Sequence, residues 1–143
     1  MGALAVLPGE KLLGSVWEMG SVLRGSTIER MLGANLPRTF PVIDKFVNGV
    51  ATSIKSIDLT AKSYQNAGAL ASKINGYVDK LAAFNGAKLG QAEVQGSKIA
   101  SRELQLAIPS GSMTDAQRAV INASAKRAAN LTNPVKITIT EIK

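Results

Sequence analysis

Apolar residues recur at helical spacing in two segments of the chain. Between Pro8 and Leu32 the repeat is interrupted by glycines, which each cost about 1 kcal/mol in a helix relative to alanine. We therefore expect a kink or two shorter helices there, ending at Gly33. The second repeat is regular and predicts a helix that stops at Asn85-Gly86. Its apolar positions are Leu70, Ile74, Tyr77, Val78 and Leu81. Tyr77 is therefore expected in the core.

Alternating apolar and polar residues predict strands in three places. Residues 40–59 contain two runs rich in Val, Ile and Phe around Asn48-Gly49. That pair is the strongest short signal for a two-residue hairpin, because both residues tolerate positive φ. Residues 102–109 and 135–140 also alternate, and each segment predicts one further strand.

The remaining segments complete the predicted order of elements. Thr114 and Gln117 have the spacing of a capping box and predict a helix that runs to about Leu131. Residues 86–101 are polar and rich in glycine, which suits a loop or a short edge strand. The order is helix, hairpin, helix, strand, helix, strand, which is typical of an α/β domain with a mixed sheet flanked by helices. Residues 1–143 are expected to form one domain, and Met1 is compatible with the start of an expressed piece of a longer protein.

Composition narrows the chemistry available to such a domain. The chain has no cysteine, which excludes disulfide scaffolds and zinc sites built on thiolates. It also has no histidine, so the commonest general base and the commonest transition-metal ligand are absent. Any catalysis must therefore use carboxylates, lysine or hydroxyls, with or without a hard metal ion.

The charge favours a polyanionic partner. Lys and Arg number 17 against 10 acidic residues, which gives a net charge of +7. Nucleic acid is the leading candidate for this partner, and an acidic protein is the other. The apolar run from Ala3 to Leu7 is too short to span a bilayer and lacks the basic flank of a signal peptide, so no membrane binding is expected of this domain.

The predicted hairpin carries the strongest candidate site. Asp44 is expected on its first strand, and Ser53 and Lys55 on its second. Residues two apart on a strand point to the same face, so Ser53 and Lys55 project together and the hairpin could bring Asp44 beside them. A carboxylate, a hydroxyl and an ammonium in one patch suit a metal-bound phosphate. Lys73 and Lys80 share one face of the following helix and could follow a phosphate backbone.

The hairpin and the order of elements resemble the PD-(D/E)xK nuclease superfamily, which has a restriction-endonuclease-like core. Two positions depart from its motif. Pro41 precedes Asp44 by three residues instead of one, and Ser53 occupies the place of the second acid. Glu18 and Glu29 both lie in the first helical segment, and their spacing does not decide which of them faces the hairpin.

Three longer strings resemble the C-terminal toxin domains of contact-dependent growth inhibition proteins, from about Arg24 to the C-terminus. They are Arg24-Gly25 with Glu29, the run NGVATSIKSIDL, and the run SRELQLAIP. These toxin domains are nucleases, and some of them carry serine at the position of the second acid. The resemblance selects Glu29 over Glu18 and implies a site made of Glu29, Asp44, Ser53 and Lys55.

The resemblance also implies a cofactor, partners and a place of action. Glu29 and Asp44 would hold a divalent metal, with Mg²⁺ as the first choice and Mn²⁺ and Zn²⁺ as alternatives. Ser53 would bind a water on the metal, and Lys55 would stabilise the charge that develops on the phosphate. A large secreted cell-surface protein would deliver the domain into the cytoplasm of a target bacterium. A cognate immunity protein, expected to be acidic, would cover the basic cleft.

The expected function is a metal-dependent nuclease toxin that hydrolyses transfer RNA in competing bacteria. The RNA preference comes from the toxin domains that the chain resembles most. With three Phe, two Tyr and one Trp, the chain has few aromatic rings on which to stack single-stranded bases, so a folded RNA or a duplex suits it better. Two alternatives stay open: a DNase toxin of the same fold, and a basic nucleic-acid-binding module without catalysis.

Overall fold

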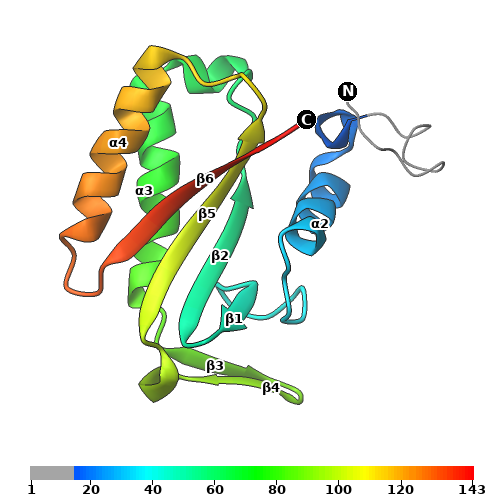
Figure 1. The fold of residues 1–143 in the computed structure, drawn as a ribbon, viewed down its shortest axis with the longest axis vertical. Helices are drawn as coiled ribbons and strands as arrows, with labels where there is room; N and C mark the ends of the chain where they lie inside the picture. The colour runs from blue at the N-terminus through cyan, green and yellow to red at the C-terminus, as the bar shows by residue number, and fades with distance from the viewer. Residues whose placement is uncertain (1–14) are drawn as a thin grey trace.

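Four strands form the central sheet in the order β1-β2-β5-β6 (Figure 1). The computed structural model describes residues 15–143. Its sheet contains β1 (Lys45–Val47), β2 (Val50–Ser56), β5 (Ser101–Pro109) and β6 (Val135–Ile142). β1 runs antiparallel to β2, whereas β5 is parallel to both β2 and β6. The sheet is therefore mixed, and the predicted fold class is confirmed.

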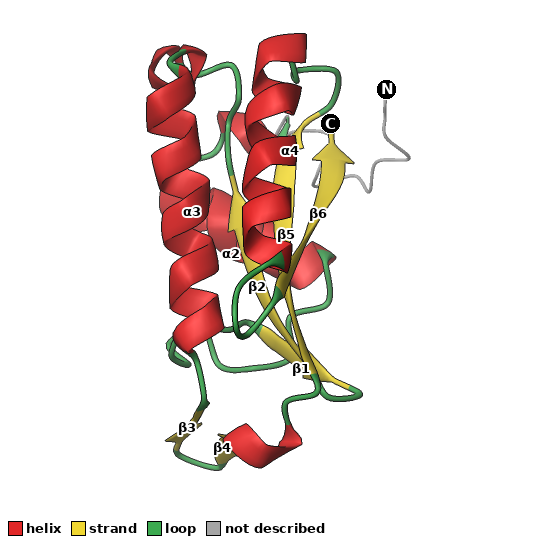
Figure 2. Cartoon of the chain, turned by 90° about the vertical axis from the view of Figure 1, so that its left-hand side faces the viewer, coloured by secondary structure: helices red, strands yellow, loops and turns green. Residues whose placement is uncertain are grey.

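Helices cover both faces of this sheet (Figure 2). The long helices α3 (Ala67–Ala83) and α4 (Asp115–Ala129) lie side by side on one face, and α2 (Ser21–Met31) packs against β2 on the other. Three short 3-10 turns are η1 (Val16–Glu18), η2 (Lys62–Gln65) and η3 (Gly96–Lys98). No helix within residues 15–143 is long and apolar enough to cross a bilayer.

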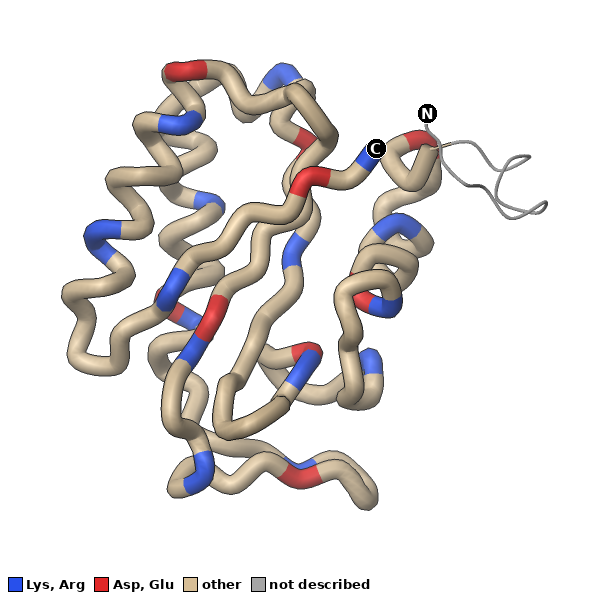
Figure 3. The backbone as a smooth tube through the Cα atoms, viewed as in Figure 1, with Lys and Arg blue, Asp and Glu red and all other residues tan. Residues whose placement is uncertain are grey.

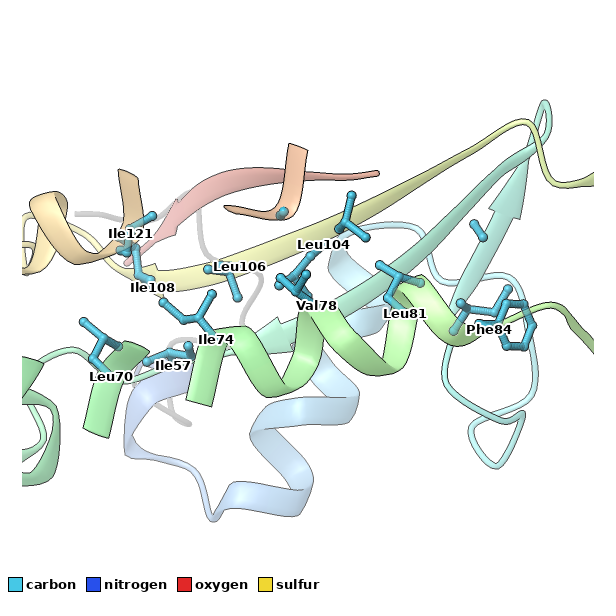
Figure 4. Close-up of a cluster of buried hydrophobic side chains, with 14 of the residues drawn as sticks. Ile57, Leu70, Ile74, Val78, Leu81, Phe84, Leu104, Leu106, Ile108 and Ile121 are labelled. Carbon is cyan, nitrogen blue, oxygen red and sulfur yellow. The ribbon is translucent and has the colours of Figure 1, made fainter. Parts of the chain in front are cut away.

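The main core lies between the sheet and α3 (Figure 4). Four of the five apolar positions predicted for this helix are buried, and they are Leu70, Ile74, Val78 and Leu81. From β5, Leu104, Leu106 and Ile108 point toward α3. On the opposite face, Ala107 of β5 packs with Ile28 and Ile54 beneath α2. β5 is thus covered on both faces, as a central strand of a parallel pair should be.

Tyr77 is the exception, because it packs against the edge of the main core without being buried in it. The side chain is only half buried and lines a groove on the outer side of α3. At about 100° per residue, Tyr77 lies at the edge of the apolar stripe, on the side where Lys73 and Lys80 also lie. Tyr77 therefore lies at the boundary between the core-facing side of α3 and its basic side.

The first helical segment is divided, as its glycines predicted. Gly20 is the N-cap residue of α2, and η1 ends just before it. Gly33 has a φ of +87° directly after the last turn of α2, which agrees with the predicted stop. The indole Nε1–H of Trp17 donates to the carbonyl of Ile142 at 2.8 Å and ties η1 to the end of β6. Residues 8–14 of the predicted helix lie outside the described part of the chain.

The predicted turns and caps are present at their expected residues. Asn48 and Gly49 have φ values of 52° and 80° and join β1 to β2. Thr114 and Gln117 form a complete capping box at the start of α4. Residues 86–101 differ from their prediction, because they form a separate hairpin of β3 (Gly86–Leu89) and β4 (Ala92–Gln95) that projects from one end of the molecule (Figure 1).

Candidate active site

Asp44 lies at the point where β1 separates from β2. Its N–H donates to the carbonyl of Thr52 at 2.9 Å, but its own carbonyl accepts from Asn35 and Leu36 in the loop after α2. The carboxylate Oδ2 instead accepts the N–H of Ile54 at 2.8 Å. Asp44 was predicted to lie on the first strand of the hairpin. In the structure it directly precedes β1. Strand pairing ends here because the carbonyl is turned away and the side chain takes its place.

Ser53 and Lys55 point to the same face of β2, as their spacing predicted. Their neighbours Ala51 and Ile57 on that face belong to the core beneath α3, whereas Ile54 points to α2. Ser53 is only 2% exposed. Lys55 is partly exposed, and its Nζ lies 5.3 Å from the centre of the Tyr77 ring. The strand thus presents a buried hydroxyl next to an ammonium at the rim of the core.

Glu29 reaches the site from α2, and the packing of that helix puts it there. Ile28 is buried against Ile54 of β2, which places the next residue along the helix at the margin of the interface. Glu18, the other glutamate of this segment, is exposed in η1. The choice of Glu29 over Glu18 stays a prediction, and the position of Glu29 near Asp44 supports it.

Hydrogen bonds between the segment that ends α2 and the residues of β1 fix the position of Glu29 relative to Asp44. Lys45 Nζ donates to the carbonyl of Leu32 at the end of α2, at 3.3 Å. The Asn35 amide pairs with both backbone groups of Phe46, at 2.9 and 3.0 Å, as a neighbouring strand would. The end of α2 is therefore tied to β1 next to Asp44.

The pKa values of the two carboxylates are both raised, chiefly by burial. Burial raises the pKa of Glu29, and the nearby carboxylate of Asp44 raises it further, while Arg38 and Lys55 lower it in part. Burial also raises the pKa of Asp44, against the lowering effects of the Ile54 N–H and of Lys55. Two close, partly desolvated carboxylates of this kind are stabilised in their ionised form by a cation.

The pair fits a hard divalent ion better than a soft one. Carboxylate oxygens are the ligands that Mg²⁺ prefers, and Mg²⁺ usually takes one or two of them and keeps several waters. Within the described residues no group of three or more His, Cys, Asp or Glu side chains could enclose a metal. A site of Glu29 and Asp44 alone would therefore leave coordination positions for water and phosphate.

A groove on α3 adjoins the site and carries both predicted nucleic-acid-binding lysines. Its volume is about 460 Å³. It is lined by Tyr64, Ala69, Ser72, Lys73, Gly76, Tyr77 and Lys80. Lys73 Nζ lies 5.4 Å from the centre of the Tyr77 ring, so this ring contacts the ammonium groups of both Lys55 and Lys73. Tyr77 therefore lines the groove and also contacts Lys55, which itself is not among the lining residues.

Two residues of this region were not predicted from the sequence. Tyr77 follows Lys73 by four positions, a spacing at which helical side chains meet, and that signal could have placed it on the basic face. Arg38 lies in the loop after α2, where its charge acts on Glu29. No pattern in the sequence marks Arg38, because its position depends on the path of the loop.

Comparison with protein families identifies the class of this fold. Residues 24–140 match the model of the CDI toxin restriction endonuclease-like domain. The chain belongs to this family of contact-dependent growth inhibition toxins. The family assignment confirms the resemblance found in the sequence, and the restriction endonuclease-like domain confirms a nuclease class.

Individual relatives agree with the family. The chain is 34% identical over 140 residues to deoxyribonuclease CdiA-o11 of Escherichia coli O157:H7 (strain EC869), covering 92% of this chain and 36% of that protein. It is 30% identical over 141 residues to deoxyribonuclease CdiA of Yersinia pseudotuberculosis serotype O:3 (strain YPIII), covering 92% of this chain and 13% of that protein. The chain thus spans a minor part of the curated relatives that it matches.

A solved structure shares the fold. It is a chain of the CdiA-CT/CdiI toxin and immunity complex from Yersinia pseudotuberculosis, with a TM-score of 0.69 and 31% sequence identity. The match covers 81% of this chain and 98% of that one.

The prediction of transfer RNA as substrate is wrong. Both curated relatives are named deoxyribonucleases, which favours the DNase alternative. The physical reason is that a site of this kind would act on the phosphodiester group, which RNA and DNA share. Metal-assisted hydrolysis uses water as nucleophile and needs no ribose 2′-hydroxyl. Asp44 and Lys55 therefore carry no information about the sugar, and the RNA preference had come from resemblance alone.

Proposed function

We propose that this chain is a DNA-cleaving toxin domain, a metal-dependent endonuclease with Glu29, Asp44, Ser53 and Lys55 as its active site. One observation carries the proposal. Two partly buried carboxylates with raised pKa values lie within electrostatic range of the Lys55 ammonium, on a restriction endonuclease-like fold. Perturbed carboxylates beside a lysine are typical of nuclease sites that hold a metal and a phosphate together.

The proposal assigns a role to each residue of the site. Glu29 and Asp44 would hold a divalent ion, with Mg²⁺ as the first choice and Mn²⁺ or Zn²⁺ as alternatives. Such an ion, when bound, polarises the phosphate and lowers the pKa of an attacking water. Lys55 stabilises the negative charge that develops on the non-bridging phosphate oxygens. Ser53, which lies beneath the site, offers its hydroxyl to a bound water.

The relatives also suggest how the domain reaches its substrate. Their CdiA names, and the short part of each that this chain covers, favour a domain carried by a large cell-surface protein. We propose that it acts in the cytoplasm of a target bacterium.

Its partner would be a cognate immunity protein, because the similar solved structure is a toxin and immunity complex. The net charge of +7 favours an acidic surface on that partner. Figure 3 shows Lys and Arg on the helices at both sides of the sheet.

The direct test is to incubate the purified chain with supercoiled plasmid DNA and, separately, with total transfer RNA. Each mixture is made with Mg²⁺, Mn²⁺ or Zn²⁺, and repeated with EDTA. We expect nicked and linear plasmid with at least one metal, no cleavage with EDTA, and intact transfer RNA. Binding of DNA without cleavage under all three metals would favour the non-catalytic binding module instead.

The groove makes a separate prediction about DNA affinity. Lys73→Ala and Lys80→Ala should each weaken DNA binding a few-fold and reduce the slope of log K against log salt by about 0.9, because each removes one phosphate contact. Fluorescence anisotropy of a labelled duplex over a range of salt concentrations measures both quantities. Lys126→Ala on α4 is the matched control, since this exposed lysine lies outside the groove. An equal change in the control would mean that the groove does not bind DNA.

A further inference from the structure

The Lys55 ammonium is in contact with an aromatic ring instead of a carboxylate. Within residues 15–143, the single ion pair joins Arg127 to Asp79, and no hydrogen bond from Lys55 Nζ to a side chain or carbonyl is formed. The ammonium lies over the Tyr77 ring, 5.3 Å from its centre. A lysine side chain has a flexible four-carbon stem, so a lysine that acts on one phosphate needs something to limit its positions.

A neutral ring is well suited to this task. The face of an aromatic ring attracts a cation through its quadrupole and leaves the charge of that cation in place. Burial raises the pKa of Tyr77, with a partial opposing effect from Lys73, so the ring is an uncharged phenol at neutral pH. A direct ion pair with Asp44 or Glu29 would instead use a carboxylate that the metal requires.

The same ring also contacts Lys73, at 5.4 Å, at the edge of the groove. Lys55 comes from β2 and Lys73 from α3, so Tyr77 joins the active site to the groove across two elements. Both Nζ atoms lie within 5.4 Å of the same ring centre. The distance between them is therefore at most that of about three nucleotide steps, at about 3.4 Å of helix axis per step. A strand bound along the groove would then meet Lys55 at its scissile phosphate.

We infer that Tyr77 is a positioning residue of the nuclease, whose ring holds the Lys55 ammonium where the scissile phosphate binds. This inference rests on the proposed function. It assigns to Tyr77 an effect on turnover and not on DNA affinity, and it assigns that effect to the ring and not to the hydroxyl.

The kinetic test compares Tyr77→Leu with Tyr77→Phe on plasmid DNA at saturating metal. Tyr77→Leu should lower kcat about tenfold with KM within about twofold, because a lost cation–π contact is of that size. Tyr77→Phe keeps the ring and should retain most of the kcat. Phe84→Leu is the structural control, since Phe84 is a buried aromatic residue at the end of α3 with no lysine over its ring. It should lower Tm without lowering kcat.

Two further measurements make the result decisive. In a Lys55→Met background, Tyr77→Leu should cause no additional loss of kcat, because the ring then has no ammonium to position. In proton NMR, the Lys55 ε-methylene signal should be shifted upfield in the wild type by the ring current, and the shift should vanish in Tyr77→Leu.

Three outcomes would overturn the role of Tyr77. These are an unchanged kcat in Tyr77→Leu, an equal loss of kcat in Tyr77→Phe, or a wild-type protein without the upfield shift. Failure of the proposed function looks different, since the wild type would then cut no DNA with any metal. The NMR measurement needs only the folded wild type, so it tests the contact even if Tyr77→Leu does not fold.

Discussion

Asp44→Asn should reduce DNA cleavage by at least about a thousandfold while leaving the fold intact. The amide keeps an oxygen that can accept the Ile54 N–H, so the end of the strand pairing is preserved. It removes the negative charge that would hold the metal. Loss of metal-assisted charge stabilisation worth several kcal/mol corresponds to a rate change of this size. Plasmid cleavage over a long time course measures the residual activity.

The same variant should be more stable than the wild type at pH 7 in EDTA. Burial raises the pKa of Asp44 in the folded state, so the folded protein binds more protons than the unfolded chain between the ordinary and the raised pKa. The free energy of unfolding of the wild type therefore falls as the pH rises through this window, and the full penalty remains above it. The uncharged amide of the Asp44→Asn variant carries no such penalty. The stabilising effect of the substitution should be present at pH 7 and should fade at about pH 4 and below, near the ordinary pKa of aspartate.

Asp44→Ala is the matched comparison. It also removes the charge, but it leaves the Ile54 N–H without its acceptor, which costs about 1–3 kcal/mol at a buried position. Thermal unfolding in EDTA should therefore give a higher Tm for Asp44→Asn than for Asp44→Ala. Cleavage by Asp44→Asn within tenfold of the wild type would show that Asp44 holds no catalytic metal.

Lys55→Met should lower kcat by about a hundredfold to a thousandfold, which is the usual effect of removing one group that stabilises transition-state charge. Methionine keeps an unbranched apolar chain against the rim of the core, so a change in Tm should be small. DNA affinity should fall only a few-fold, because one phosphate contact is lost. Single-turnover cleavage and anisotropy measure the two effects separately.

Lys126→Met supplies the control for net charge, since Lys126 is exposed on α4 away from β2. Lys55→Arg should not restore the activity fully, because a planar guanidinium with a different reach replaces a compact ammonium. If Lys55→Met and Lys126→Met had the same small effects, Lys55 would be an ordinary basic surface residue and the binding-module alternative would gain support.

Local sequence signals predicted most of the fold because the forces behind them act over few residues. Asn48 and Gly49 accept positive φ at low cost, so they close the hairpin wherever it packs. The capping box of Thr114 and Gln117 satisfies the first N–H groups of α4 from within its own turn. The residues 86–101 were harder, because a hairpin that stands apart from the main sheet has little apolar alternation to mark it.

In the candidate site, too, some residues are placed by local sequence patterns and one is placed by tertiary packing. Ser53 and Lys55 share a strand, so the period of two determined that they point together. Asp44 is close to them through a tight turn. Glu29 is different, since its distance from Asp44 depends on how α2 packs on β2 through Ile28, and two glutamates were equally acceptable by spacing. The resemblance selected Glu29, and its position beside Asp44 follows from tertiary packing.

The sequence by itself determined the elements of the main sheet and its helices, their order and the chemical types available, because spacing, turn residues and the absence of histidine and cysteine are properties of the chain alone. The tertiary structure alone decided three things. It turned the Asp44 carboxylate onto the Ile54 N–H, moved Tyr77 from the core to the rim, and brought the Lys55 ammonium over the Tyr77 ring. The place of Tyr77 and its contact with Lys55 depend on how α3 packs on the sheet, and the Asp44–Ile54 hydrogen bond depends on how the backbone turns away at the start of β1. No local pattern encodes these contacts.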